Sequence, residues 1–321
     1  MLYRVLKIWV GLSSRLFCRK IFINKPDLLK AKGPLLLAAN HPNSFLDAVI
    51  LDILFDQPVW SLARGDVFKN PFYIRLLTML KILPVYRTSE GVENLETNYK
   101  TFDDCKELFK KKAIVLMFSE GKCVNEWHLR PLRKGTARLA ISSWKDDIHV
   151  KVLPAGINYS SFYRFGKNVW LNFGELITIN EFDLNETDGK LNLAFNQKLQ
   201  NQLEQLVFEI DSNDKKAQEQ QLTVQPGILK RITLLLPAIA GFVFHIPYYL
   251  PLKIFSKKRT TGTGHYDSVI IALVTLLYPF YVLLFSFLMV CFFHSWYFLA
   301  SILVLPFTAW SYIQLKGQLD K

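Results

Sequence analysis

Two residues with the chemistry of an acid–base pair lie close together between positions 35 and 51. An apolar run rich in Leu and Ala ends at Asn40 and His41, and Asp47 follows one or two turns into the next predicted helix. A neutral imidazole can accept a proton, and a carboxylate on its other ring nitrogen can orient it. His41 and Asp47 are therefore a candidate base and orienting group. The alternative is a capped helix that carries a partly buried histidine.

The elements that must position this pair are a strand and a helix. The apolar run has the composition of a strand buried on both faces. The corner Pro42–Ser44 has the chemistry of a helix start, with Asn43 or Ser44 able to cap a helix over 45–54. Ligands of parallel sheets gather beyond the carboxyl ends of strands, which is where His41 lies.

Apolar runs and helix-like segments alternate along the first two thirds of the chain. This alternation predicts an α/β fold with a mostly parallel central sheet flanked by helices. The predicted strands span residues 34–39, 59–63, 82–86, 114–118, 149–157 and 169–173, and the predicted helices span 45–54, 67–81, 90–112, 132–144 and 189–221.

The composition indicates a membrane protein. Of 321 residues 50% are hydrophobic and 25 are Phe, while the formal net charge is +12. Such a basic surface suits nucleic acid, an anionic leaflet or phosphorylated substrates, and the hydrophobicity favours the membrane. We see no zinc-finger spacing or RNA-binding aromatic signature, so we expect no nucleic-acid partner. The 4 cysteines are too scattered for a disulfide framework, which favours a reducing compartment.

Four segments differ in character. Residues 1–24 mix apolar and basic residues and predict an amphipathic helix at the membrane interface, or one packed on the domain. Residues 25–215 hold the α/β pattern, residues 216–227 are polar and resemble a linker, and residues 228–321 are strongly hydrophobic.

The hydrophobic region predicts transmembrane helices. Residues 268–293 contain no formally charged residue and are long enough to span a bilayer, and residues 296–313 are compatible with crossing back. Residues 232–255 contain Pro237, Pro247 and Pro251, which favours a Pro-broken re-entrant or interfacial segment, with a third full span as the alternative. Basic residues flank these runs, so the positive-inside rule places the α/β domain of this integral membrane protein on the cytoplasmic side.

Four ordered blocks of the chain resemble one family. The first is Asn40–Asp47, and the second is Gly65–Phe68 leading to Leu83–Arg87. The third is Phe118–Gly121, and the fourth is Val152–Tyr159. Together, in this order and at these spacings, they resemble the glycerolipid acyltransferases of the 1-acylglycerol-3-phosphate acyltransferase superfamily.

Two departures from that family pattern bear on the site. Five residues separate His41 from Asp47, one more than the family usually has. If the two cooperate, we expect a carboxylate oxygen of Asp47 within roughly 5 Å of a ring nitrogen of His41. In the third block Ser119 replaces a proline, and Lys122 stands where a small hydroxyl residue is common.

The resemblance, which covers roughly residues 25–215, implies acyl transfer without a serine or cysteine nucleophile. His41 would be the general base and Asp47 its partner, and acyl-CoA or acyl carrier protein would supply the thioester as co-substrate. No cofactor and no metal is expected, because Cys123, His128 and Glu120 lack a second half of a metal site. The residues implied in substrate binding are Asn43, Gly65, Arg87, Glu120, Gly121, Lys122 and Pro154.

The implied acceptor is lysophosphatidate in a phospholipid membrane. Arg87 would clamp its phosphate, Lys122 would add a second phosphate contact, and Glu120 would contact an acceptor hydroxyl. Pro154 has the simpler interpretation of shaping a strand. Glycerol-3-phosphate or another lysolipid is the alternative acceptor, and a catalytically inactive, membrane-bound lipid-binding protein of the same fold is the alternative to an enzyme.

Overall fold

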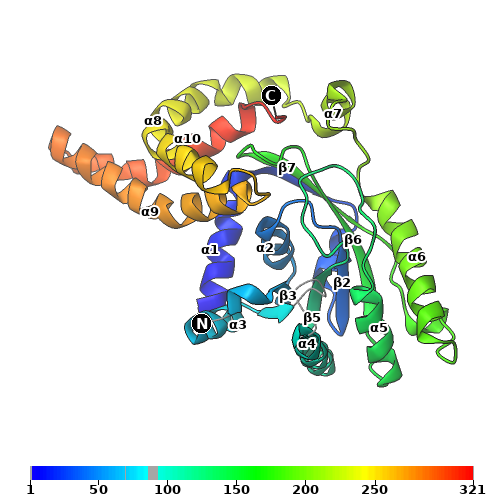
Figure 1. Cartoon of the computed structure of the whole chain (residues 1–321). Coiled ribbons are helices and arrows are strands. Elements are labelled where there is room, and N and C mark those ends of the chain that lie inside the picture. Colours follow the sequence, from blue (N-terminus) through cyan, green and yellow to red (C-terminus); the bar gives the residue numbers. More distant parts are fainter. Residues whose placement is uncertain (1, 69, 86–92, 321) are drawn as a thin grey trace. The chain divides into compact units, whose positions relative to one another are not determined.

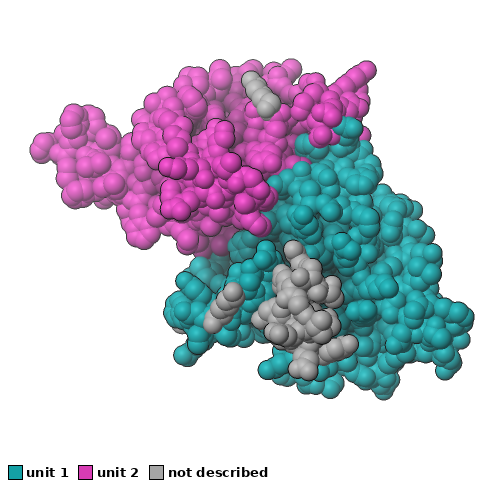
Figure 2. Space-filling view, in the orientation of Figure 1, with its two compact units in different colours: residues 1–8, 23–158, 170–211 teal, residues 9–22, 159–169, 212–321 magenta. Residues whose placement is uncertain are grey.

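A computed structural model describes residues 2–68, 70–85 and 93–320 of the chain. The chain folds into two compact units, shown in teal and magenta in Figure 2. Unit 1 consists of residues 1–8, 23–158 and 170–211, and unit 2 consists of residues 9–22, 159–169 and 212–321.

A seven-stranded sheet carries the α/β fold, and its strand order is β1-β7-β6-β2-β5-β3-β4. Strand β2 pairs in parallel with β5 and β6, and β3 pairs in parallel with β4 and β5. The predicted fold class, a mostly parallel sheet flanked by helices, is confirmed. The strands are β1 (Cys18–Ile23), β2 (Leu35–Ala39), β3 (Val59–Arg64), β4 (Ile82–Val85), β5 (Ile114–Phe118), β6 (Lys151–Tyr159) and β7 (Lys167–Phe173).

Helices cover both faces of the sheet in unit 1. All five residues of β2 are buried, as expected for a central strand with helices on either side. Leu36 and Ala38 pack with residues of α4, α5 and α6, so the alternate residues of β2 point to the other face, where Figure 1 shows α2. These helices are α2 (Phe45–Leu54), α3 (Pro71–Met79), α4 (Glu93–Lys110), α5 (Gly135–Lys145) and α6 (Asp188–Leu206).

Three segments differ from the predicted elements. Helix α1 (Leu2–Phe17) ends early, because residues 18–23 of the predicted amphipathic segment form β1. Helix α6 ends at Leu206 rather than near 221. Part of the predicted linker is a helix, α7 (Lys215–Leu222), whose Asp214 cap accepts from the backbone NH of Ala217.

The described residues of unit 2 form three helices that are long and apolar enough to cross a membrane. These regions span residues 228–260, 266–293 and 296–315, and Figure 1 shows them in yellow to red. The three prolines of residues 232–255 lie inside one continuous helix, so the predicted Pro-broken segment is not found. Each proline removes one backbone hydrogen bond of the helix, and the remaining ones can hold the helix together. The helices are α8 (Ile228–Thr260), α9 (Tyr266–Phe293) and α10 (Ser301–Leu315).

Candidate active site

His41 and Asp47 meet just beyond the carboxyl end of β2. The Nδ1 atom of His41 lies 2.8 Å from Oδ2 of Asp47, well inside the expected limit. The Asp47 side chain is fully buried, whereas the His41 side chain is 19% exposed. No hydrogen bond to Nε2 of His41 occurs among the described residues. A neutral imidazole held in this way presents Nε2 as the proton acceptor.

The corner between β2 and α2 accommodates the additional residue before Asp47. Ser44 takes the unusual backbone angles φ 51° and ψ −134°, in a region that favours glycine. Helix α2 then begins at Phe45, so Asp47 lies in its first turn. There Oδ2 of Asp47 also accepts from the backbone NH of Asn43 at 2.8 Å. A strained residue in the corner therefore brings the carboxylate back toward His41.

The predicted caps of α2 work differently from expectation. Ser44 occupies the N-cap position without a side-chain capping hydrogen bond. Its backbone NH donates to Sγ of Cys123 at 2.9 Å. In place of a side-chain cap from Asn43 or Ser44, the carboxylate of Asp47 accepts a hydrogen bond from the backbone NH of Asn43 at the N-terminus of α2. This end of the helix carries partial positive charge, which favours a carboxylate there.

Two neighbours of His41 were not predicted from the sequence. The ring of Phe118, the last residue of β5, stacks on the imidazole at a centroid distance of 3.8 Å and an angle of 9°. The side chain of Asn40 exchanges two hydrogen bonds with the backbone of Ile157, at 3.0 and 2.7 Å. The register shows why these contacts form, because Ala39 lies opposite Phe118 in β5 and beside β6.

Glu120 braces the backbone that carries His41. Its Oε2 atom accepts from the backbone NH of His41 at 2.8 Å, and its Oε1 atom accepts from the backbone NH of Arg130 at 2.9 Å. The side chain is buried, and this burial raises the pKa of the carboxyl, although both NH groups favour the charged form. Glu120 thereby holds the backbone of His41 in place next to that of Arg130. Its contact with an acceptor hydroxyl stays a prediction.

The other residues of the third block lie on the loop after β5. Gly121 has a φ of +67°, where glycine is favoured, and an added Cβ would lie 3.0 Å from a side-chain carbon of Arg133. Lys122 is exposed and forms no ion pair within the described part of the chain. Arg87, the predicted phosphate clamp, lies outside the described residues.

Gly65 and Pro154 are placed by strand ends. Gly65 is buried and begins a 3₁₀ turn directly after β3. Pro154 is buried inside β6, opposite Ala38 of β2, and its carbonyl accepts from the backbone NH of Gly174. Pro154 is therefore part of the central sheet, and its contact with a substrate stays a prediction.

Cys123 lies beside the pair but is poorly suited to act as a nucleophile. Burial, followed by the nearby charge of Asp47, raises the pKa of its thiol to about 12. A thiol with so high a pKa holds little of the reactive thiolate near neutral pH. No group of three or more His, Cys, Asp or Glu side chains suited to a metal occurs among the described residues.

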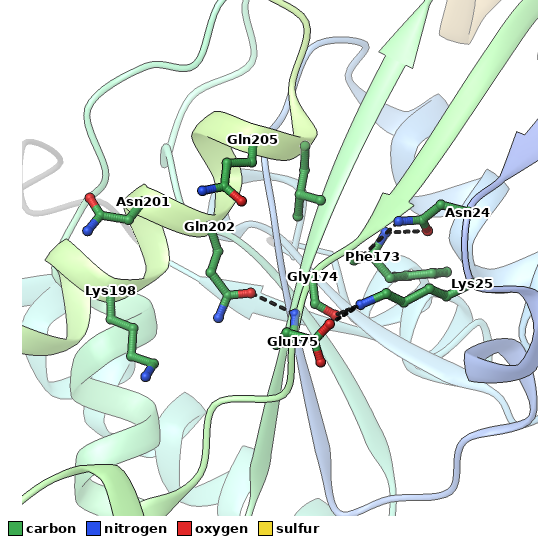
Figure 3. A pocket seen from close by; sticks show the side chains of 10 residues that line it. Asn24, Lys25, Phe173, Gly174, Glu175, Lys198, Asn201, Gln202 and Gln205 are labelled. Atoms are coloured by element: carbon green, nitrogen blue, oxygen red, sulfur yellow. Dashed lines mark hydrogen bonds and ion pairs between the residues drawn. The ribbon is translucent and has the colours of Figure 1, made fainter.

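A cavity of unit 1, of about 600 Å³, lies away from these residues, between α6 and the ends of β1 and β7. Figure 3 shows that Asn24, Lys25 and Gln202 of its wall bond to residues 173–175. The carboxylate of Glu175 pairs with Lys25, and Gln202 accepts from the backbone NH of Glu175 at 2.7 Å. None of the predicted site residues lines this cavity, which lies near the β1 edge of the sheet.

The geometry thus combines a parallel α/β sheet with a histidine–carboxylate pair beyond its central strand. Residues 20–158 match a family model described as Acyltransferase. This match contains all four sequence blocks except the last residue of the fourth. The region belongs to the glycerolipid acyltransferase superfamily, as the blocks predict.

Known proteins with related sequences carry names from the same superfamily. A chloroplastic 1-acyl-sn-glycerol-3-phosphate acyltransferase of Brassica napus is 23% identical over 152 residues, which are 47% of this chain and 42% of that protein. Glycerol-3-phosphate O-acyltransferase 2 of Saccharomyces cerevisiae is 24% identical over 168 residues, which are 49% of this chain and 22% of that protein. The chain thus spans less than half the length of either relative.

A solved structure covers more of the chain at lower identity. The 1-acyl-sn-glycerophosphate acyltransferase PlsC of Thermotoga maritima aligns with 64% of this chain and 79% of its own chain, at 15% identity and a TM-score of 0.41.

Proposed function

We propose that this chain is a membrane-bound O-acyltransferase of phospholipid biosynthesis that acylates the free hydroxyl of 1-acylglycerol-3-phosphate. The acyl donor is the thioester of acyl-CoA or of acyl carrier protein. The observation that carries the proposal is the 2.8 Å contact between His41 Nδ1 and the buried carboxylate of Asp47, just beyond the carboxyl end of β2, while Nε2 has no hydrogen bond to a described residue. Membership of the superfamily supports the reaction class.

The proposed reaction is a direct transfer. Nε2 of His41 accepts the proton of the acceptor hydroxyl while its oxygen bonds to the thioester carbon. The carboxylate of Asp47 keeps the proton on Nδ1 and stabilises the imidazolium that forms. Collapse of the tetrahedral intermediate breaks the carbon–sulfur bond, and the imidazolium returns the proton to the departing thiolate. No covalent enzyme intermediate is needed, and the raised pKa of Cys123 supports this.

A phosphate on the acceptor would need cationic partners. Arg87 is the proposed clamp, since a guanidinium binds phosphate bidentately. Lys122 is exposed, and without an ion pair in the described ranges its ammonium is available for a second contact. Glycerol-3-phosphate or another lysolipid is the second candidate acceptor, and the name of the yeast relative favours glycerol-3-phosphate.

The setting we propose is a bilayer with the acyltransferase region on its cytoplasmic side. Among the residues that the structure describes, three helices are long and apolar enough to cross a membrane. Basic residues flank them, among them Lys257, Lys258 and Arg259 in the last turn of α8. Helix α1 adds an apolar stripe at helical spacing that is exposed to solvent, formed by Leu2, Val5, Ile8 and Leu12.

The test is acyl transfer by the full chain purified in detergent. Radiolabelled acyl-CoA and acyl carrier protein are each offered with lysophosphatidate or glycerol-3-phosphate, and the lipid products are separated. We expect phosphatidate from lysophosphatidate, and transfer to neither acceptor would refute the proposal in favour of an inactive lipid-binding protein. His41→Ala should abolish transfer, and unchanged activity in this variant would exclude His41 as the base.

A matched control for His41 lies in the same unit. His128 also contacts a carboxylate, that of Glu209, but its side chain is 63% exposed. His128→Ala should therefore leave the transfer rate unchanged. An equal loss in both variants would indicate general damage to the protein rather than a lost base.

A further inference from the structure

Unit 2 contains a partly open, mostly apolar cavity between α8, α9 and α10. Its volume is about 360 Å³, within the range of cavities that bind small molecules, roughly 300–1,000 Å³. Water-sized groups occupy roughly 30 Å³ each, so the cavity holds on the order of a dozen of them. That is room for much of one hydrocarbon chain and too little for two.

Three polar side chains of the cavity wall form hydrogen bonds within the protein. Nδ1 of His245 donates to the carbonyl of Gly241 at 2.8 Å, and the hydroxyl of Tyr278 lies 3.0 Å from Nε2 of His245. The hydroxyl of Tyr248 donates to the carbonyl of Val274 at 2.6 Å. The wall therefore presents aromatic rings and aliphatic groups to the cavity, which suits an acyl chain better than a polar ligand.

Positive charge gathers at the edge of this cavity. Lys253 and Lys316 both line it, and neither forms an ion pair in the described part of the chain. Arg164 lies close by, with its guanidinium 3.2 Å from the carbonyl of Gly317. Burial, and then repulsion by Arg164 and Lys253, lowers the pKa of Lys316 to about 8.

The carboxylate of Asp320, near these cations, already accepts hydrogen bonds within the protein. Asp320 accepts from the hydroxyl of Ser161 at 2.6 Å and from the backbone NH of Phe162 at 3.2 Å. Lys316 interacts electrostatically with two cations, Arg164 and Lys253, and with one carboxylate, that of Asp320, so the edge of the cavity keeps an excess of positive charge. A phosphate monoester, which carries close to two negative charges, complements this excess better than one carboxylate or a zwitterion.

We propose that this cavity binds one lysophospholipid with a phosphate monoester head, the phosphate on Lys253 and Lys316 and the acyl chain along Tyr248 and Tyr278. Every residue of this site belongs to unit 2. The site is thus distinct from the residues of the proposed acyl transfer, and its occupancy does not require that transfer. It would hold a phosphorylated single-chain lipid within the membrane region.

Photolabelling of the full chain in detergent tests this site. The probe is lysophosphatidate with a diazirine near the end of its acyl chain, used without an acyl donor, and the labelled peptides are identified by mass spectrometry. We expect labels within residues 241–250 and 274–278, removed by excess lysophosphatidate. Labels confined to other peptides would overturn the proposal, as would equal competition by a free fatty acid or by lysophosphatidylcholine.

Charge variants test the head-group contacts. Lys253→Gln with Lys316→Gln should reduce labelling of unit 2 at least tenfold, whereas arginine at both positions should preserve it. The matched control is Lys257→Gln with Lys258→Gln, since these lysines are exposed at the end of α8 and do not line the cavity. Equal labelling in the two glutamine pairs would refute the head-group assignment.

A filling variant tests the chain contacts. Ala309 lines the cavity, so Ala309→Phe should block labelling, whereas Ala272→Phe on the exposed side of α9 should not. Circular dichroism and gel filtration check that each variant folds. His41→Ala should lose acyl transfer and keep these labels, so failure of the proposed catalysis and failure of this site give different results.

Discussion

Replacing Asp47 by Asn tests the histidine–carboxylate pair most directly. Oδ2 of Asp47 accepts both from the backbone NH of Asn43 and from Nδ1 of His41, each at 2.8 Å. An amide of nearly the same shape can keep only part of this arrangement. In one orientation its oxygen faces Nδ1, and only the negative charge is lost. In the other its NH₂ group faces Nδ1, and the imidazole then carries its proton on Nε2 and cannot act as base.

The size of the effect follows from these two orientations. General base catalysis contributes roughly 10²–10⁴ to the rate, which is about 3–5 kcal/mol of activation free energy. Loss of charge alone leaves the base in its correct tautomer, so we expect the lower end of that range. The wrong tautomer removes the base and gives the upper end. In both cases kcat falls while the KM for the acceptor stays nearly constant, because Asp47 is buried behind His41.

The assay measures acyl transfer from acyl-CoA to lysophosphatidate over a range of acceptor concentrations. Asp52→Asn is the matched control, because Asp52 lies in the same helix but contacts Tyr3 and the backbone NH of Val59 instead of His41. Thermal unfolding of each variant monitors the fold. A folded Asp47→Asn protein with a kcat within threefold of the original would refute the role of this carboxylate. An equal loss in Asp52→Asn would assign the effect to helix α2 as a whole.

Three further variants have defined outcomes. Cys123→Ser should keep acyl transfer within tenfold, because no thiol of the protein takes part in the proposed reaction, and complete loss would indicate a cysteine nucleophile. Glu120→Gln should lower the free energy of unfolding by about 1–3 kcal/mol, because an amide offers only one oxygen to two backbone NH groups; unchanged denaturant unfolding would contradict this. Lys167→Met should cost about 3–5 kcal/mol by leaving the buried Asp267 without its ion pair. Adding Asp267→Leu should recover much of that loss in thermal unfolding, and no recovery would contradict the argument.

Most of the fold could be predicted because its strands are buried and its helices are amphipathic. Strand β2 and helix α2 have strong patterns, and α2 spans the predicted residues 45–54. Strand β1 was missed because its sequence, CRKIFI, mixes basic and apolar residues and continues the pattern of α1. Such an edge strand is defined by the neighbour it pairs with, and local sequence does not contain that information. The end of α6 and the start of α7 were missed for a related reason, since polar Gln-rich sequence continues across both.

The site could be predicted only as a set of residue types near strand ends. The approach of His41 to Asp47 followed from one strand and one helix that are adjacent in sequence. The stacking of Phe118 on His41 and the backbone contacts of Glu120 depend instead on the pairing of β2 with β5. Residues 39 and 118 are far apart in the chain, and their register is a property of the assembled sheet. For that reason the sequence did not predict that the carboxylate of Glu120 accepts from the backbone NH of His41.

The additional residue before Asp47 shows how spacing in sequence differs from distance in space. A corner of regular turns would carry the carboxylate away from His41 if one residue were inserted. The chain avoids this by placing Ser44 at φ 51°, a conformation that costs of order 1–3 kcal/mol for a residue other than glycine. Two hydrogen bonds of the site itself compensate this cost. The Asp47 carboxylate accepts from the backbone NH of Asn43, and the sulfur of Cys123 accepts from the backbone NH of Ser44. Because the strain and the histidine–carboxylate contact share one corner, a change that relaxes the corner should also separate the pair.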